Sequence, residues 1–159
     1  MNHAMVCYLV GWMLSVEGGI LLLPMLTAVI YQEPIAFAYL AVSALCLVFS
    51  CLFTRCKPKN TRFYAREGFV TVSLCWIVLA LTGALPFWLS GEIPSYVDAL
   101  FESISGFTTT GATILGDVEA LSHASLLWRS LTHWVGGMGV LVFMLAVLPL
   151  ASGRSSARL

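Results

Sequence analysis

Uncharged apolar stretches alternate with short polar segments along most of the chain. Residues 34–54, 68–91 and 130–153 contain no Asp, Glu, Lys or Arg over 21, 24 and 24 positions, and the stretch 5–30 is interrupted only by Glu17. A helix needs about 20 apolar residues to cross the ~30 Å hydrocarbon core of a bilayer. The pattern therefore predicts four membrane-spanning helices, over residues 5–30, 35–53, 69–89 and 126–150.

The overall composition leads to the same class of protein. Hydrophobic residues make up 59% of the chain, charged residues 10%, and the mean hydropathy is +0.91. Soluble domains contain about 45–50% apolar and about 25% charged residues, so we expect an all-α integral membrane protein and exclude a nucleic-acid-binding surface. The five cysteines form no C-x-x-C pair, and we interpret them as small apolar packing residues.

Charge is distributed unequally between the two sides of the predicted spans. Seven of the eight basic residues lie in the loop 55–67 or the tail 153–159, and six of the eight acids lie on the opposite side. Because cytoplasmic loops carry an excess of Lys and Arg, we expect the basic side and both termini to be cytoplasmic. The first two spans then form a hairpin with a very short outer turn.

The connection between the third and fourth spans, residues 90–125, is too long and too apolar for a structureless loop. Pro94-Ser95 is a helix-start signal, and the segment that follows repeats apolar residues at spacings of three and four. A helix over 95–107 is too short to cross the membrane, so we interpret it as re-entrant. The apolar positions are Val97, Leu100, Phe101, Ile104 and Phe107.

The uncharged stretch 108–113 follows this short helix and is rich in Thr and Gly. Backbone carbonyls in such a stretch can replace the hydration shell of a cation, and Gly111 can adopt the positive φ that aims successive carbonyls alike. The C-terminus of the short helix would direct partial negative charge at the ion. A pore loop is the more specific functional interpretation, and a Thr-rich surface turn after a peripheral helix is the alternative.

Several motifs resemble one known family. The stretches DALFESISGFTTTGATIL and WRSLTHWVGGMGVLVFMLAVLP, with REGF at 66–69 and GALPF at 83–87, closely resemble the first pore repeat of the TrkH/KtrB family of potassium uptake proteins. The first two spans resemble the extra N-terminal hairpin of its TrkH branch. The resemblance implies a hairpin (1–54), a cytoplasmic basic loop (55–67), one pore repeat (68–152) and a tail (153–159). The repeat would comprise an outer helix (69–89), a pore helix (95–107), a filter (108–113) and an inner helix (126–150).

The resemblance also implies the chemistry of the filter. Its backbone carbonyls would form one quarter of the potassium sites, and the residues that match are Thr109, Thr110, Gly111, Ala112 and Thr113. A potassium-channel filter has a second glycine where this sequence has Thr113. This difference predicts a looser filter with weaker discrimination against sodium.

Family members carry four such repeats, and this sequence carries one. We expect a fragment of a four-repeat transporter; a homotetramer and a non-transporting remnant or interaction subunit are the alternatives. The resemblance implies a homodimer of full-length subunits in the inner membrane, with a cytoplasmic nucleotide-binding regulatory subunit near the loop 55–67. Potassium would be the substrate and no cofactor would be bound.

Arg129 is the single basic residue near the outer side. A pair with Glu102 would support the filter from behind, Asp117 and Glu119 are alternative partners, and a barrier to cations is a less favoured role. We interpret Glu17 as a hydrogen-bonded structural acid, with an ion-pathway role as the alternative.

Gly136, Gly137 and Gly139 permit either close helix packing or a gating bend. An enzyme is not expected, because no G-x-S-x-G motif accompanies the serines of the short helix and the single histidine of the fourth span, His133.

Overall fold

The computed structural model describes residues 3–55 and 65–152, apart from the side chains of 65–66, 140 and 142–152. These residues form α-helices, and no strand occurs among them, as an all-α protein requires. Most of the predicted basic loop and the whole tail lie outside the described residues. The helices are α1 (His3–Ile20), α2 (Leu22–Ile30), α3 (Ala36–Arg55), α4 (Ala65–Leu89), α5 (Tyr96–Phe107) and α6 (His123–Ser152).

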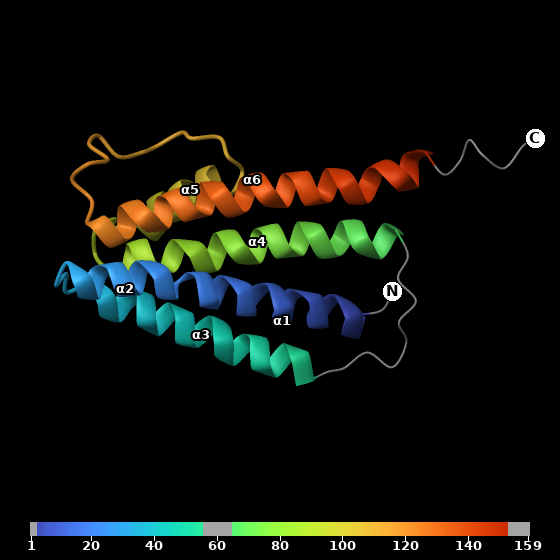
Figure 1. Cartoon of the computed structure of the whole chain (residues 1–159), viewed down its shortest axis with the longest axis horizontal. Coiled ribbons are helices and arrows are strands. Elements are labelled where there is room, and N and C mark those ends of the chain that lie inside the picture. The colour runs from blue at the N-terminus through green and yellow to red at the C-terminus, as the bar shows by residue number, and fades with distance from the viewer. Residues whose placement is uncertain (1–2, 56–64, 153–159) are drawn as a thin grey trace, which may run out of the picture.

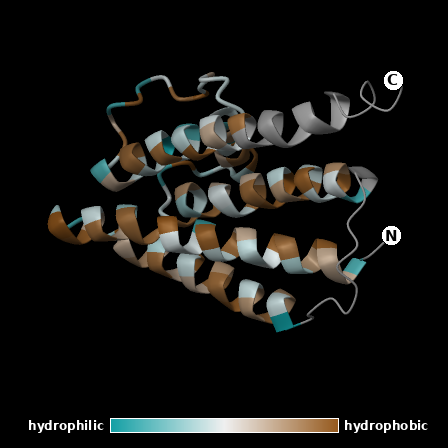
Figure 2. Ribbon diagram, turned by 45° about the vertical axis from the view of Figure 1, so that its right-hand side comes forward, coloured by the Kyte–Doolittle hydropathy of each residue, from teal (hydrophilic) through white to brown (hydrophobic). Residues whose placement is uncertain are grey.

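The long helices lie side by side in an antiparallel array (Figure 1). The α2–α3 turn, α5 and the connection to α6 gather at one end, and α1 begins and α6 ends toward the other. α1 packs along α3, whereas α5 packs against α4 and α6. Hydrophobic positions extend along the length of α1, α3 and α4 (Figure 2).

Three described segments are long and apolar enough to cross a membrane, namely His3–Ile30, Ala36–Arg55 and Glu67–Leu89. The fourth predicted span falls within the 30 residues of α6. Because many side chains in the second half of α6 lie outside the description, this span stays a prediction.

The first predicted span is not one continuous helix, since it is divided at Leu21 into α1 and α2. Pro24 explains the break: it has no amide hydrogen to donate to Ile20, and its ring crowds that carbonyl. The hairpin meets α4 through Glu17, whose Oε2 accepts a 2.6 Å hydrogen bond from the Thr82 hydroxyl. Glu17 is only 3% exposed, so this acid joins two helices inside the protein.

Two carboxylates from separate turns hold the first turn of α6. Glu33, between α2 and α3, accepts the backbone N–H groups of His123 at 2.8 Å and Ala124 at 3.2 Å. Glu92, between α4 and α5, accepts the N–H of Ser122 at 2.7 Å and the hydroxyl of Ser125. Because the first N–H groups of a helix lack internal partners, these contacts fix the N-terminal end of α6 against both turns.

These contacts also affect the protonation of Glu33. Partial burial raises the pKa of its carboxyl, but hydrogen bonds from the backbone and ring of His123 and from the Ala124 N–H outweigh burial. The pKa therefore lies below the ordinary value of 4.5. A lowered pKa means that the ionised carboxylate stabilises the fold above about pH 4.5, and that this stabilisation is lost as the pH falls through the folded-state pKa.

We expect Glu33→Gln to lower the free energy of unfolding by about 1 kcal/mol at pH 7, the usual range for a charge at a helix N-terminus. At pH 3 the difference from the parent should shrink, because the unfolded parent takes up a proton at Glu33 at a higher pH than the folded parent does. Thermal unfolding of the detergent-solubilised chain at both pH values measures this. Glu119→Gln, at an exposed position, is the control, and an equal loss at pH 3 and pH 7 would contradict the assignment.

Candidate functional site between α5 and α6

Close contacts between α4, α5 and α6 determine where the candidate site lies. An added Cβ at Gly83 would lie 2.7 Å from the Phe107 ring, and one at Gly106 would lie 2.9 Å from Cβ of Thr132. Trp128 fills the space between the three helices and donates its Nε1–H to the Gly83 carbonyl at 2.9 Å. The missing side chains of these glycines therefore allow the short helix to lie deep between its neighbours.

α5 begins at a capped turn, where the Ser95 hydroxyl accepts the N–H of Asp98. The apolar face predicted for this helix is only partly buried within the chain. Phe107 is 2% exposed and Leu100 packs against the core, whereas Val97 is 72% exposed and Phe101 and Ile104 are also exposed. The opposite face is buried and is made mostly of small or polar residues: Ala99, Glu102, Ser103, Ser105 and Gly106. α5 thus directs its hydrogen-bonding groups toward the segment that follows it.

The segment 108–113 turns at Thr108-Thr109 and then returns along α5 as irregular, non-helical backbone. Gly111 has φ of +75°, the left-handed conformation suggested by its residue type, and Thr109 has φ of +57°. The N–H of Thr109 donates to the Gly106 carbonyl, and the N–H of Thr110 donates to the Ser105 carbonyl at 3.0 Å. Residues 108–114 are all exposed, so one side of this segment is open while the other contacts α5.

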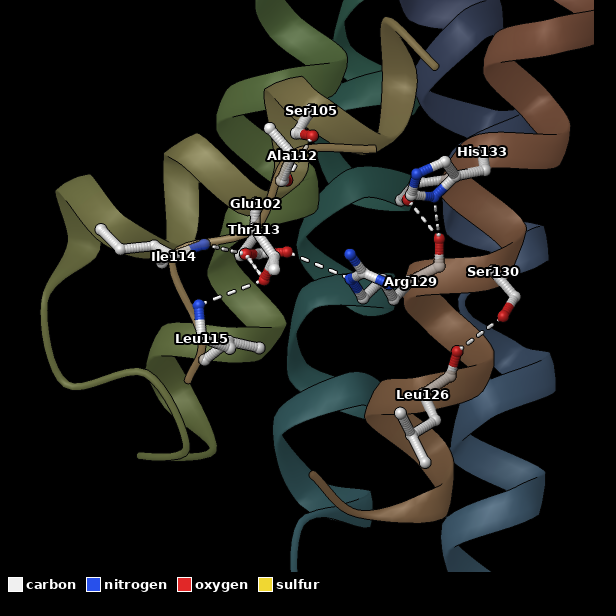
Figure 3. Close-up of polar contacts among 11 residues, drawn as sticks. Glu102, Ser105, Ala112, Thr113, Ile114, Leu115, Leu126, Arg129, Ser130 and His133 are labelled. Atoms are coloured by element: carbon white, nitrogen blue, oxygen red, sulfur yellow. Dashed lines mark hydrogen bonds and ion pairs between the residues drawn. The ribbon is translucent and has the colours of Figure 1, made fainter. Parts of the chain in front are cut away.

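Glu102 connects the far end of this segment to α6 (Figure 3). Its Oε1 accepts the N–H of Ile114 at 2.7 Å and the hydroxyl of Thr113, and its Oε2 accepts Nε–H of Arg129 at 3.1 Å. Glu102 is 2% exposed. Of the three acids considered as partners of Arg129, the structure therefore places Glu102 against it.

Of the other two acids, Asp117 accepts the backbone N–H of Glu119 at 3.0 Å, and neither carboxylate is paired with Arg129 among the described residues. His133 lies one turn beyond Arg129, and its Nδ1 is 2.8 Å from the Arg129 carbonyl. No group of three or more His, Cys, Asp or Glu side chains suitable for a metal ion occurs among the described residues. The only ligands that this segment offers to a cation are therefore carbonyl and hydroxyl oxygens.

The three glycines of α6 differ in their surroundings. A Cβ at Gly136 would overlap the Phe107 carbonyl oxygen and lie 2.7 Å from the carbonyl carbon. At Gly137 the nearest atom is Cγ2 of Thr109 at 3.9 Å, and at Gly139 it is the Trp76 ring at 3.3 Å. The surroundings of Gly136 favour the packing interpretation at that position.

Sequence reasoning missed two features of this site. Ser105 donates its hydroxyl hydrogen to the Ala112 carbonyl at 2.6 Å. From the sequence, this serine was considered only as a possible catalytic nucleophile. The roles of Glu33 and Glu92 at α6 were also missed. The signal for Ser105 was the polar face of α5, on which Glu102 and Ser105 lie three residues apart.

Fold and site together define an all-helical membrane protein in which a short helix and a non-helical segment lie between two long helices. The sequence model of TrkH, described as a cation transport protein, matches residues 36–159. The chain belongs to the TrkH family.

Individual relatives agree with this assignment. The chain is 39% identical over 153 residues to the Trk system potassium uptake protein TrkH of Salmonella typhimurium, covering 94% of this chain and 32% of the relative. It is 35% identical over 149 residues to the Trk system potassium uptake protein TrkG of Escherichia coli K12, covering 91% and 30%. The crystal structure of the potassium transporter TrkH from Vibrio parahaemolyticus matches with a TM-score of 0.88 at 32% identity, over 99% of this chain and 34% of that one. The chain thus spans about a third of the length of these relatives.

We expect Glu102→Gln to lower the free energy of unfolding by about 3 kcal/mol, because breaking a buried ion pair leaves the other charge uncompensated. Glu119→Gln, the matched control at an exposed position, should change it by less than about 0.5 kcal/mol. Thermal unfolding of the detergent-solubilised variants measures both. Equal stability of the two variants would contradict a supporting role for Glu102.

A second pair of variants separates packing from bending in α6. We expect Gly136→Ala to destabilise the chain by about 1–3 kcal/mol, since the methyl group meets the Phe107 backbone. Gly137→Ala should be neutral or stabilising by up to about 1 kcal/mol, because alanine favours a helix and open space surrounds the position. Equal effects at both positions in the same unfolding assay would favour a bending role.

Proposed function

We propose that this chain supplies one pore repeat of a Trk-type potassium uptake protein, with residues 108–113 as one wall of the ion pathway. The observation that carries the proposal is the non-helical segment itself, whose exposed side is open and whose other side is held by α5. Backbone carbonyls would provide one quarter of the potassium ligands, from Thr109, Thr110, Gly111, Ala112 and Thr113. The names of the relatives, potassium uptake proteins and a potassium transporter, support this choice of ion.

The electrostatics of the segment suit a cation. α5 ends at Phe107, directly before the segment. Unpaired carbonyls at the C-terminus of a helix carry partial negative charge. Carbonyl and hydroxyl oxygens are neutral ligands, so they replace water around a potassium ion without binding it too tightly to leave. The Glu102–Arg129 pair lies behind the segment and would hold it in place.

A single segment forms only one wall of the proposed ion pathway, so further walls are needed to enclose an ion. We propose that the remaining repeats come from the same full-length subunit or from other copies, and that such subunits form a homodimer in the inner membrane. Both termini and the loop 55–67 would face the cytoplasm, where the loop would meet anionic lipid or a nucleotide-binding regulatory subunit. In this arrangement the protein transports an ion and is not an enzyme.

Gly111→Val tests the filter assignment. A β-branched residue is strongly disfavoured at positive φ, so the substitution should distort the segment and abolish potassium uptake. Gly91→Val is the matched control, because Gly91 has φ of +77° and open space around it, as Gly111 does. The control carries the same backbone cost away from the segment and should keep its uptake.

The test uses cells that lack potassium uptake. They carry the Salmonella TrkH with its matching N-terminal third replaced by this chain, and rubidium uptake is measured at equal membrane abundance. Uptake by the hybrid that is lost in Gly111→Val but kept in Gly91→Val supports the proposal. A hybrid present in the membrane without uptake, or full uptake in Gly111→Val, contradicts it and favours a non-transporting protein. Rescue by this chain alone would show that identical copies supply the other walls.

A further inference from the structure

Ser105 lies in the last turn of α5 and contacts three successive residues of the segment 108–113. Its carbonyl oxygen accepts the N–H of Thr110 at 3.0 Å and, in a longer contact of 3.5 Å, the N–H of Gly111. Its hydroxyl donates to the Ala112 carbonyl at 2.6 Å (Figure 3). Ser105 is only 5% exposed, so these hydrogen bonds join a buried side chain to the exposed segment.

The hydroxyl bond distinguishes the Ala112 carbonyl from its neighbours. A carbonyl oxygen has two lone pairs, and the Ser105 hydroxyl occupies one of them. Among the described residues, no hydrogen bond reaches the carbonyl oxygens of Thr109, Thr110, Gly111 or Thr113. Four of the five proposed ligand carbonyls therefore have no protein partner, and the fifth, that of Ala112, is bound by the helix behind the segment.

We propose that Ser105 is a positioning residue for ion selectivity: its hydroxyl holds the Ala112 carbonyl back and so limits how closely the oxygens can surround an ion. This inference rests on the proposed function of residues 108–113. Selectivity depends on the number and freedom of the coordinating carbonyls. A sodium ion is smaller than potassium and needs its ligands to move inward, and a carbonyl released from Ser105 can follow it. The tether therefore favours the larger ion.

The chain offers a closely matched control for Ser105. Ser103 lies on the same helix and is fully buried, but its hydroxyl has no hydrogen-bond partner among the described residues. Ser103→Ala and Ser105→Ala thus remove the same atom from the same helix, and only the second releases a carbonyl of the segment.

The first experiment measures competition of sodium with rubidium uptake in the hybrid protein described above. Ser105→Ala should lower the preference for the larger ion by about fivefold, the factor that corresponds to one hydrogen bond. Ser103→Ala should keep the parental ratio, and Ser105→Thr should restore it because it keeps the hydroxyl. A ratio unchanged in Ser105→Ala overturns the inference and leaves the proposed function standing, whereas a hybrid without uptake overturns both.

A second experiment needs no ion flux. Ala112-Thr113 is the single Ala-Thr dipeptide in the sequence, so labelling alanine carbonyls with carbon-13 and threonine amides with nitrogen-15 selects the Ala112 carbonyl by NMR. In the detergent-solubilised chain, Ser105→Ala should shift this carbonyl signal upfield, as loss of a hydrogen bond requires, and Ser103→Ala should leave it in place. The same shift in both variants, or in neither, overturns the proposed tether.

Discussion

The buried carboxylate of Glu102 is the contact on which the site depends. A non-helical backbone with no neighbouring strand must satisfy its N–H groups in another way, and here the N–H of Ile114 and the hydroxyl of Thr113 both reach Glu102. The charge that this places inside the protein is compensated by Arg129. Glu102 thus holds the end of the segment, and Arg129 of α6 offsets the cost of burying the charge of Glu102.

This contact is possible only because the helices around it are close together and the N-terminal end of α6 is fixed. Gly83 and Gly136 leave space for the ring and the backbone of Phe107, the last residue of α5. Glu33 and Glu92 hold the first turn of α6 against two separate turns. Arg129 lies less than two turns further along α6. Its position therefore follows from the capping contacts before it and from the close packing at Gly136 after it.

The sequence predicted the long helices and the short helix because hydropathy and helical spacing are local signals. It also identified Gly111 by residue type, and it favoured Glu102 as the partner of Arg129 with Asp117 and Glu119 as alternatives. The break at Leu21 and the tether from Ser105 depend on how backbone groups meet in three dimensions. The residue types alone do not distinguish Ser105 from Ser103. The Ser105 hydroxyl nevertheless has a hydrogen-bond partner, and the Ser103 hydroxyl has none among the described residues.

Exposed apolar side chains also lie on one side of the site. The apolar face of α5 is exposed at Val97 and Phe101, and an apolar groove of about 330 Å³ separates α5 from α4 near Ile104 and Thr108. The segment 108–114 is exposed beside them. An ion needs oxygens on all sides, and one such segment supplies them from a single direction. Under the proposed function, the surfaces that are exposed here would be the ones that neighbouring repeats or lipid cover, and ion selection would belong to the assembly and not to one wall.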